Sequence, residues 1–155
     1  MLDGFLSFLA LIIAIVIHEI AHGFVAYRFG DPTAKQLGRL SMNPIVHIDP
    51  IGSILLPGLL WFSGTSFLLG WAKPVPVNSR YFKNPEKAML WVAFAGPLSN
   101  ITLAVMASLI LSFLSLVKLQ DGLLLQSLSI LAIFLIKFID INLILAIFNL
   151  IPIPP

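Results

Sequence analysis

Apolar residues in this sequence form four long runs that are separated by short polar stretches. The runs cover residues 5–29, 51–71, 88–117 and 123–150. The first, third and fourth are each longer than the roughly 20 residues that a helix needs to cross the hydrocarbon core of a bilayer. The pattern therefore predicts three transmembrane helices, with the second run as a separate case.

The second run, residues 51–71, is interrupted by residues that break helices: Pro57, Gly58, Gly64 and Gly70. The stretches on both sides of it, 28–49 and 72–87, carry several Lys and Arg residues. Such loops favour the cytoplasmic side, and a complete crossing would separate the two. We therefore favour a re-entrant segment that returns to the same side, sheltered by protein. A short complete span remains the alternative.

The predicted fold is an all-α membrane protein, a multi-span bundle in which residues 1–155 form a single core. A small irregular or β portion is expected around residues 33–85, between the first span and the next true one. Composition agrees with this prediction, because 59% of the residues are hydrophobic and only 10% are charged, whereas soluble domains have about 25% charged residues. We expect a multi-pass protein of the cell membrane, with the lipid bilayer as its surroundings.

Charge and cysteine content exclude several classes of site. The formal net charge is only +2, and the basic residues lie in short loops, so nucleic-acid binding is not expected. The chain has no cysteine, which excludes disulfides and thiolate metal ligands.

The first run contains the motif His18-Glu19-Ile20-Ala21-His22. Residues four apart lie on the same face of a helix, so His18 and His22 can hold one metal ion together. Glu19 is offset from His18 by about 100° and lies beside such a metal, where it can take a proton from water. The pattern indicates a Zn²⁺ site, because zinc lowers the pKa of bound water and polarises a carbonyl.

A structural role is the alternative explanation of this motif. Two buried histidines and a glutamate can simply pair with neighbouring helices. However, an ionisable side chain at the centre of a membrane helix costs about 2.5 kcal/mol or more, so such residues usually have a function. Metal binding is therefore the favoured interpretation.

Four segments together resemble the site-2 protease family of intramembrane zinc metalloproteases, in particular its short bacterial and archaeal members. The segments are His-Glu-Ile-Ala-His at 18–22, Asn-Pro-Ile-Val-His-Ile-Asp-Pro-Ile-Gly at 43–52, Phe-Ala-Gly-Pro-Leu-Ser-Asn at 94–100 and Asn-Leu-Ile-Pro-Ile-Pro-Pro at 149–155. The resemblance implies one zinc ion per chain and regulated intramembrane proteolysis. Its substrate would be a transmembrane protein or peptide, cut at an active site toward the cytoplasm.

The resemblance also implies roles for single residues. His18 and His22 would be zinc ligands and Glu19 the catalytic base. Asn100 would position the substrate or stabilise the oxyanion, and we count it with Glu19 as catalytic.

The last motif departs from the family pattern. In the family it continues as Asn-x-x-Pro-x-Pro-x-x-Asp-Gly, and this Asp is the third protein ligand, whereas the present sequence stops at Pro155. Since a catalytic zinc requires three protein ligands, we expect a truncated enzyme that is inactive or poorly metallated. His47 and Asp49 are weak candidates for the missing ligand. Together with Asn149 they are better candidates for the second shell, which supports the ligands; an Asp-Pro turn explains 49–50 equally well.

Two further features carry weaker predictions. Lys137 and Asp140 are three residues apart in the fourth run and are expected to neutralise each other. The segment Val75-Pro76-Val77 is a candidate edge strand for holding an extended substrate. An ordinary proline-stiffened loop is an equally good interpretation of that segment.

Two other functions compete with proteolysis. A metal-ion transporter can place His18, Glu19, His22 and Asp140 along an ion path, but a path needs polar residues through the full depth of the membrane. A non-catalytic membrane scaffold is consistent with the missing Asp. The sequence leaves the physiological substrate and the oligomeric state open.

Overall fold

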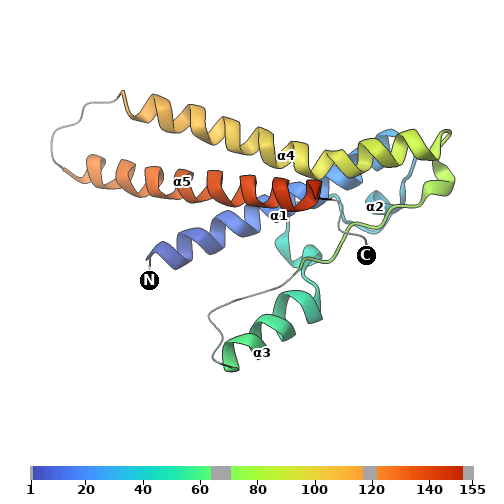
Figure 1. Cartoon of the computed structure of the whole chain (residues 1–155), viewed down its shortest axis with the longest axis horizontal. Helices are drawn as coiled ribbons and strands as arrows, with labels where there is room; N and C mark the ends of the chain where they lie inside the picture. The colour runs from blue at the N-terminus through green and yellow to red at the C-terminus, as the bar shows by residue number, and fades with distance from the viewer. Residues whose placement is uncertain (1, 64–70, 117–121, 152–155) are drawn as a thin grey trace. The chain divides into compact units, whose positions relative to one another are not determined.

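The fold of this chain is helical. A computed structural model describes residues 2–63, 71–116 and 122–151, and these residues contain no β-strand (Figure 1). Three of the described helices are long and apolar enough to cross a membrane: α1 (Leu2–Arg28), α4 (Pro85–Leu114) and α5 (Leu123–Leu150). The predicted all-α membrane fold is therefore confirmed.

Short elements connect α1 to α4. They are α2 (Thr33–Gln36), the 3₁₀-helix η1 (Pro44–His47), the π-helical turn η2 (Pro50–Leu55), α3 (Leu56–Phe62) and the 3₁₀-helix η3 (Ser79–Tyr81). Part of the predicted re-entrant run, residues 64–70, lies outside the described residues, as do residues 152–155 of the last motif. Whether residues 51–71 enter the membrane and return stays a prediction.

The chain divides into two compact units, and α1 and α4 each contribute to both of them. The first unit comprises residues 1–18 and 93–155, and the second comprises residues 19–92. Each unit has its own buried apolar cluster.

Small side chains allow the three long helices of the first unit to pack closely. Ala10 and Ala14 of α1 and Ala107 of α4 are buried in one cluster with two larger residues of α5, Leu135 and Phe138. Alanine at a helix interface lets backbones approach, which is the usual way in which helices associate in a membrane. Figure 1 shows α4 and α5 side by side in this unit.

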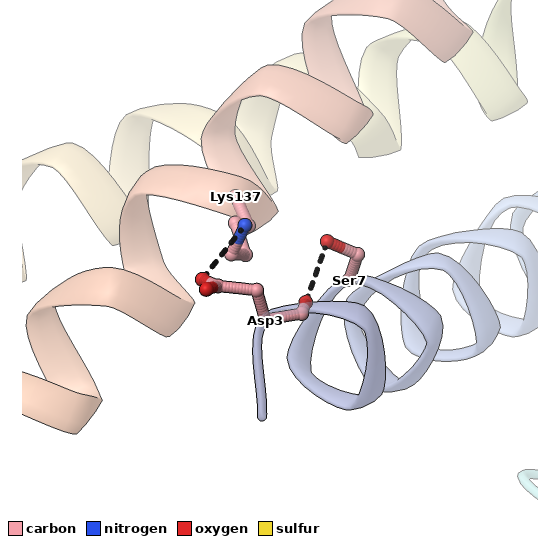
Figure 2. Close-up of polar contacts among 3 residues, drawn as sticks. All are labelled: Asp3, Ser7 and Lys137. Carbon is pink, nitrogen blue, oxygen red and sulfur yellow. Dashed lines mark hydrogen bonds and ion pairs between the residues drawn. The ribbon is translucent and has the colours of Figure 1, made fainter. Parts of the chain in front are cut away.

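The ion pair in the first unit differs from the predicted one. Lys137 Nζ lies 3.3 Å from Asp3 Oδ1, at the start of α1 (Figure 2). Asp140 is exposed, so the predicted neutralisation of Lys137 by Asp140 is wrong. Asp3 also lies at the first turn of α1, where the helix dipole favours a negative charge.

In the second unit, the extended segment 71–78 is attached to its surroundings by hydrogen bonds; we call it the docked segment. Its Trp71 N–H donates to Gly52 O (3.2 Å) and its Lys73 N–H donates to His47 O (2.9 Å). The guanidinium of Arg39, which is buried, donates to the carbonyl of Lys73 (2.6 Å). Val75-Pro76-Val77 belongs to this segment and forms no β-strand with the described residues. Its role in holding an extended substrate stays a prediction.

The turn after α1 is built around a buried carboxylate. Gly30 has φ of +107°, a conformation that favours glycine, and it leads into Asp31, whose side chain is completely buried. The Asp31 carboxylate accepts the N–H of Asn78 (2.7 Å) and both the N–H (2.9 Å) and the hydroxyl of Thr33. Burial by itself raises the pKa of Asp31, but these hydrogen bonds outweigh it and hold the pKa below its ordinary value.

We predict that Asp31→Asn lowers the free energy of unfolding by about 1–3 kcal/mol at pH 7, since an amide cannot accept all three hydrogen bonds. The lowered pKa means that the carboxylate stabilises the fold above the unfolded-state pKa of about 3.9, and that this contribution is lost as the pH falls through the folded-state pKa. The difference between wild type and variant should therefore shrink on acidification. Denaturant titration in detergent at several pH values measures it.

The exposed Asp140 provides the control for this experiment. Asp140→Asn should change the unfolding free energy by less than about 0.5 kcal/mol. A loss in Asp31→Asn no larger than this at pH 7 would contradict the structural role of the Asp31 carboxylate.

Gly23 of α1 tests the packing of the second unit. A Cβ atom at this position would lie 2.7 Å from Leu40 Cδ2 and 2.9 Å from Val75 Cγ1, whereas nothing lies within 4 Å of a Cβ at Gly4 of the same helix. We predict that Gly23→Val is destabilised by about 1–3 kcal/mol through overpacking and that Gly4→Val is not. Thermal unfolding followed by circular dichroism compares them, and equal behaviour of the two variants would refute the close approach at Gly23.

Candidate metal centre on helix α1

Helix α1 presents the three residues of the predicted metal motif. The helix is continuous from Leu2 to Arg28, so His18 and His22 are one turn apart on the same face. His18 is only 7% exposed, and Glu19 and His22 are half-buried. His18 belongs to the first unit, and Glu19 and His22 belong to the second.

Within the first unit, His18 is hydrogen bonded to an asparagine of α4. His18 Nδ1 lies 2.8 Å from Asn100 Oδ1, and Asn100 is fully buried. With the amide oxygen facing the ring, Nδ1 carries the proton and donates it. The neutral imidazole then has its lone pair on Nε2, the nitrogen that can bind a metal.

Within the second unit, His22 has an equivalent bond to the backbone of α4. Its Nδ1 lies 2.6 Å from the carbonyl oxygen of Val92. A carbonyl oxygen is only an acceptor, so Nδ1 of His22 must be the donor. This again places the lone pair of the neutral ring on Nε2.

The two histidines therefore share the arrangement that is usual for metal ligands. A metal-binding histidine almost always donates its second ring N–H to a carboxylate, carbonyl or similar oxygen, which fixes the ring and raises the basicity of the other nitrogen. The residues fit two ligands of a zinc ion. Within residues 2–63, 71–116 and 122–151, no group of three His, Cys, Asp or Glu side chains is arranged to hold a metal, and a catalytic zinc needs three protein ligands.

Glu19 is held by the docked segment. Its Oε2 atom accepts the backbone N–H of Val75 at 2.9 Å, and Val75 itself is buried. The hydrogen bond fixes the direction in which this carboxylate oxygen points. Sequence reasoning did not find this partner, because a backbone N–H leaves no trace in the identity of the residue.

Asn100 has a role that sequence reasoning did not assign to it. It was predicted to act on the substrate, whereas the structure shows its Oδ1 as the acceptor for His18. Its Nδ2 atom is buried and has no hydrogen-bond partner among the described residues. An unpaired buried amide is costly, so this nitrogen is available to a group that the described residues do not supply.

The three predicted second-shell residues make local contacts. The ring of His47 is buried, with Nε2 2.9 Å from Ser41 O. Asp49 caps the π-helical turn by accepting the N–H groups of Ile51 and Gly52, which matches the alternative of an Asp-Pro turn. Asn149 is exposed and donates to a carbonyl of its own helix. Their support of a metal site stays a prediction.

The chain is similar to curated proteins that are named as metalloproteases. It is 43% identical over 148 residues to "Putative zinc metalloprotease YwhC" of Bacillus subtilis (strain 168). This alignment covers 95% of this chain and 63% of YwhC. "Putative zinc metalloprotease Rip2" of Mycolicibacterium smegmatis is 33% identical over 95 residues, and that of Mycobacterium tuberculosis H37Rv is 32% identical over 95 residues. Each of these two alignments covers 61% of this chain and 35% of the relative.

The chain thus spans less than two thirds of YwhC and about a third of Rip2. No protein-family model and no solved structure matches it significantly. The names of these relatives are consistent with the zinc site that the motif on α1 indicates.

We predict a graded loss of zinc affinity in variants of the purified full-length protein. His18→Ala and His22→Ala remove a ligand each and should weaken binding by more than about 100-fold, whereas Asn100→Leu removes only the partner of a ligand and should cost about 10- to 100-fold. Competition with a zinc chelator measures the affinities.

Asn142→Leu is the matched control for Asn100→Leu. Asn142 is also fully buried in the first unit, but its Nδ2 donates to the carbonyl of Phe138 in its own helix. Its replacement should leave zinc affinity within about threefold, well short of the loss from a missing ligand partner. Equal losses in the two asparagine variants would assign the effect to core stability instead of the hydrogen bond to His18.

Proposed function

We propose that this chain is the core of an intramembrane zinc metalloendopeptidase, which hydrolyses peptide bonds in transmembrane segments of its substrates. The observation that carries this proposal is the pair of histidines one turn apart on a membrane-length helix, each with Nδ1 directed at an oxygen acceptor. The similarity to proteins named as zinc metalloproteases supports it.

His18 and His22 would hold the zinc ion through Nε2. The site-2 protease resemblance assigns the third ligand to an Asp that follows the motif at 149–155, beyond the described residues. When bound, zinc supplies a Lewis acid that polarises the scissile carbonyl and makes water nucleophilic near neutral pH.

Glu19 would carry the proton in this reaction. It would accept a proton from the attacking water and then donate it to the amine that leaves. One carboxylate oxygen is held by the N–H of Val75, so the docked segment sets the orientation of the base. Asn100 would act first as a positioning residue, since it fixes the ring of His18. Its unpartnered Nδ2 would be the group that contacts substrate.

The proposed substrate is a membrane-embedded peptide segment in an extended conformation, because helical hydrogen bonds protect the peptide bonds of a helix. The basic residues that flank the second apolar run indicate a cytoplasmic side for that region. We therefore place the active site toward the cytoplasm, within the membrane.

A non-catalytic scaffold is the second candidate function. One observation favours it: His18, Glu19 and His22 have hydrogen-bond partners on other segments, as polar residues with a purely structural role would. A transporter has less support, because the bonds at Nδ1 of both histidines fix the rings in place, as in a permanent site and not in a path with exchanging ligands.

We predict that Glu19→Gln abolishes proteolysis and leaves zinc binding intact. Removal of a general acid–base group should reduce cleavage of a tethered transmembrane substrate by about 10²- to 10⁴-fold. The experiment uses the full-length protein in liposomes. Electrophoresis follows the cleavage, and elemental analysis measures the bound zinc.

Glu86→Gln is the control, because Glu86 is an exposed residue of the first turn of α4. It should cleave at the wild-type rate. Undiminished cleavage by Glu19→Gln would disprove the role of Glu19, and zinc flux across the liposome membrane without cleavage would favour the transporter.

A further inference from the structure

A cavity in the second unit lies where the end of α1 meets the start of α4. It has a volume of about 470 Å³, and its lining residues are Arg28, Phe29, Gly30, Lys83, Asn84 and Lys87. Binding cavities for small molecules are usually about 300–1,000 Å³. We call this cavity the basic pocket, because three of its six lining residues are cations. None of these residues takes part in the proposed metal centre.

The walls of the basic pocket are held by contacts within the second unit. Phe29 packs edge-on against Phe82, with ring centroids 6.4 Å apart, and Phe82 belongs to the buried cluster of the second unit. At the other wall, Asn84 caps α4, since its Oδ1 accepts the N–H of Lys87 at 3.1 Å. The three cations therefore project from a fixed framework.

The charge of the basic pocket is not neutralised by its neighbours. No ion pair joins Arg28, Lys83 or Lys87 to another described residue. Two acidic residues, Asp31 and Glu86, are close in sequence to residues that line the pocket. Asp31 is buried and its carboxylate accepts three hydrogen bonds, while Glu86 does not line the cavity. The pocket therefore attracts an anion.

The position of the basic pocket favours a lipid as the source of that anion. α1 ends at Arg28 and α4 begins at Pro85, and both helices are candidate membrane spans. A pocket at these helix ends lies at the depth of the headgroups, where basic pockets bind anionic lipids. About one helical turn further into the spans from Arg28 and Lys87, the apolar side chains of Phe24, Leu90 and Trp91 are half-exposed and offer a surface for an acyl chain.

We propose that the basic pocket binds the phosphate group of an anionic phospholipid. Arg28 supplies a planar guanidinium whose Cζ lies over the ring of Phe24, 5.6 Å from its centroid, and Lys83 and Lys87 supply two ammonium groups. A zwitterionic phospholipid carries a compensating positive charge, which three cations repel.

The test uses the full-length protein in dodecyl maltoside, titrated with phosphatidylglycerol and with phosphatidylcholine, with bound lipid counted by native mass spectrometry. Wild type should bind phosphatidylglycerol at least about tenfold more tightly than phosphatidylcholine. Arg28→Gln/Lys83→Gln/Lys87→Gln should lose this preference, and Lys83→Arg/Lys87→Arg should keep it because the charge is retained.

The control variant Lys35→Gln/Lys73→Gln/Arg80→Gln removes the same charge from exposed residues of the same unit that do not line the cavity. It should bind phosphatidylglycerol within about twofold of wild type, since its three changes lie outside the pocket that holds the lipid. Equal losses in the two triple variants would show unspecific attraction and overturn the proposal.

Competition with inorganic phosphate tests whether the pocket binds a lipid or a soluble anion. Millimolar phosphate should not displace phosphatidylglycerol, and displacement would mean that the pocket is a site for soluble phosphate. Circular dichroism verifies that each variant is folded. If the triple pocket variant is not folded, the single variants Arg28→Gln and Lys83→Gln are titrated instead. A wild-type preference for phosphatidylglycerol in both would overturn the proposal.

Discussion

The requirement that a polar group inside an apolar environment must find a partner dominates this structure. α1 is a membrane-length helix that carries two imidazoles and a carboxylate, and each of these three groups is hydrogen bonded to another element. Without such partners, these groups would cost several kcal/mol each in a membrane. The same bonds that satisfy the groups also fix their orientation, so the stability of the helix and the geometry of the candidate centre have one origin.

Charged side chains replace a β-sheet as the support of the docked segment. Glu19 and Asp31 accept backbone N–H groups of Val75 and Asn78, and Arg39 donates to the carbonyl of Lys73. Asp31 and Glu19 thus make the same kind of contact, although one has a structural role and the other is the proposed base. A displacement of the docked segment would alter the setting of the Glu19 carboxylate, which couples this segment to the proposed chemistry.

The zinc hypothesis rests on the second shell as much as on the ligands. The motif by itself is shared with any helix that has histidines four residues apart. The acceptors for Nδ1 of both rings fix the rings as in metal ligands, and histidines with a purely structural role would also have such acceptors. The similarity to proteins named as putative zinc metalloproteases agrees with this hypothesis.

The sequence by itself determined the long helices and the candidate ligands, because both depend on local information. Runs of apolar residues predict spans, and a spacing of four residues on a helix places His18 and His22 on one face whatever surrounds them. The resemblance of residues 94–100 to the site-2 protease family also marked Asn100. The sequence did not reveal that Asn100 bonds to His18, which is 82 residues away.

Only the tertiary structure decided the partners. Val92 and Val75 contribute backbone atoms, which every residue has, so their identity carries no signal of the bonds to His22 and Glu19. The ion pair of Lys137 was misassigned for a related reason. The nearest opposite charge in sequence, Asp140, is exposed, whereas packing of α5 with α1 brings Asp3 to Lys137. Proximity along the chain is a guide within a helix, and contacts between helices depend on how they pack.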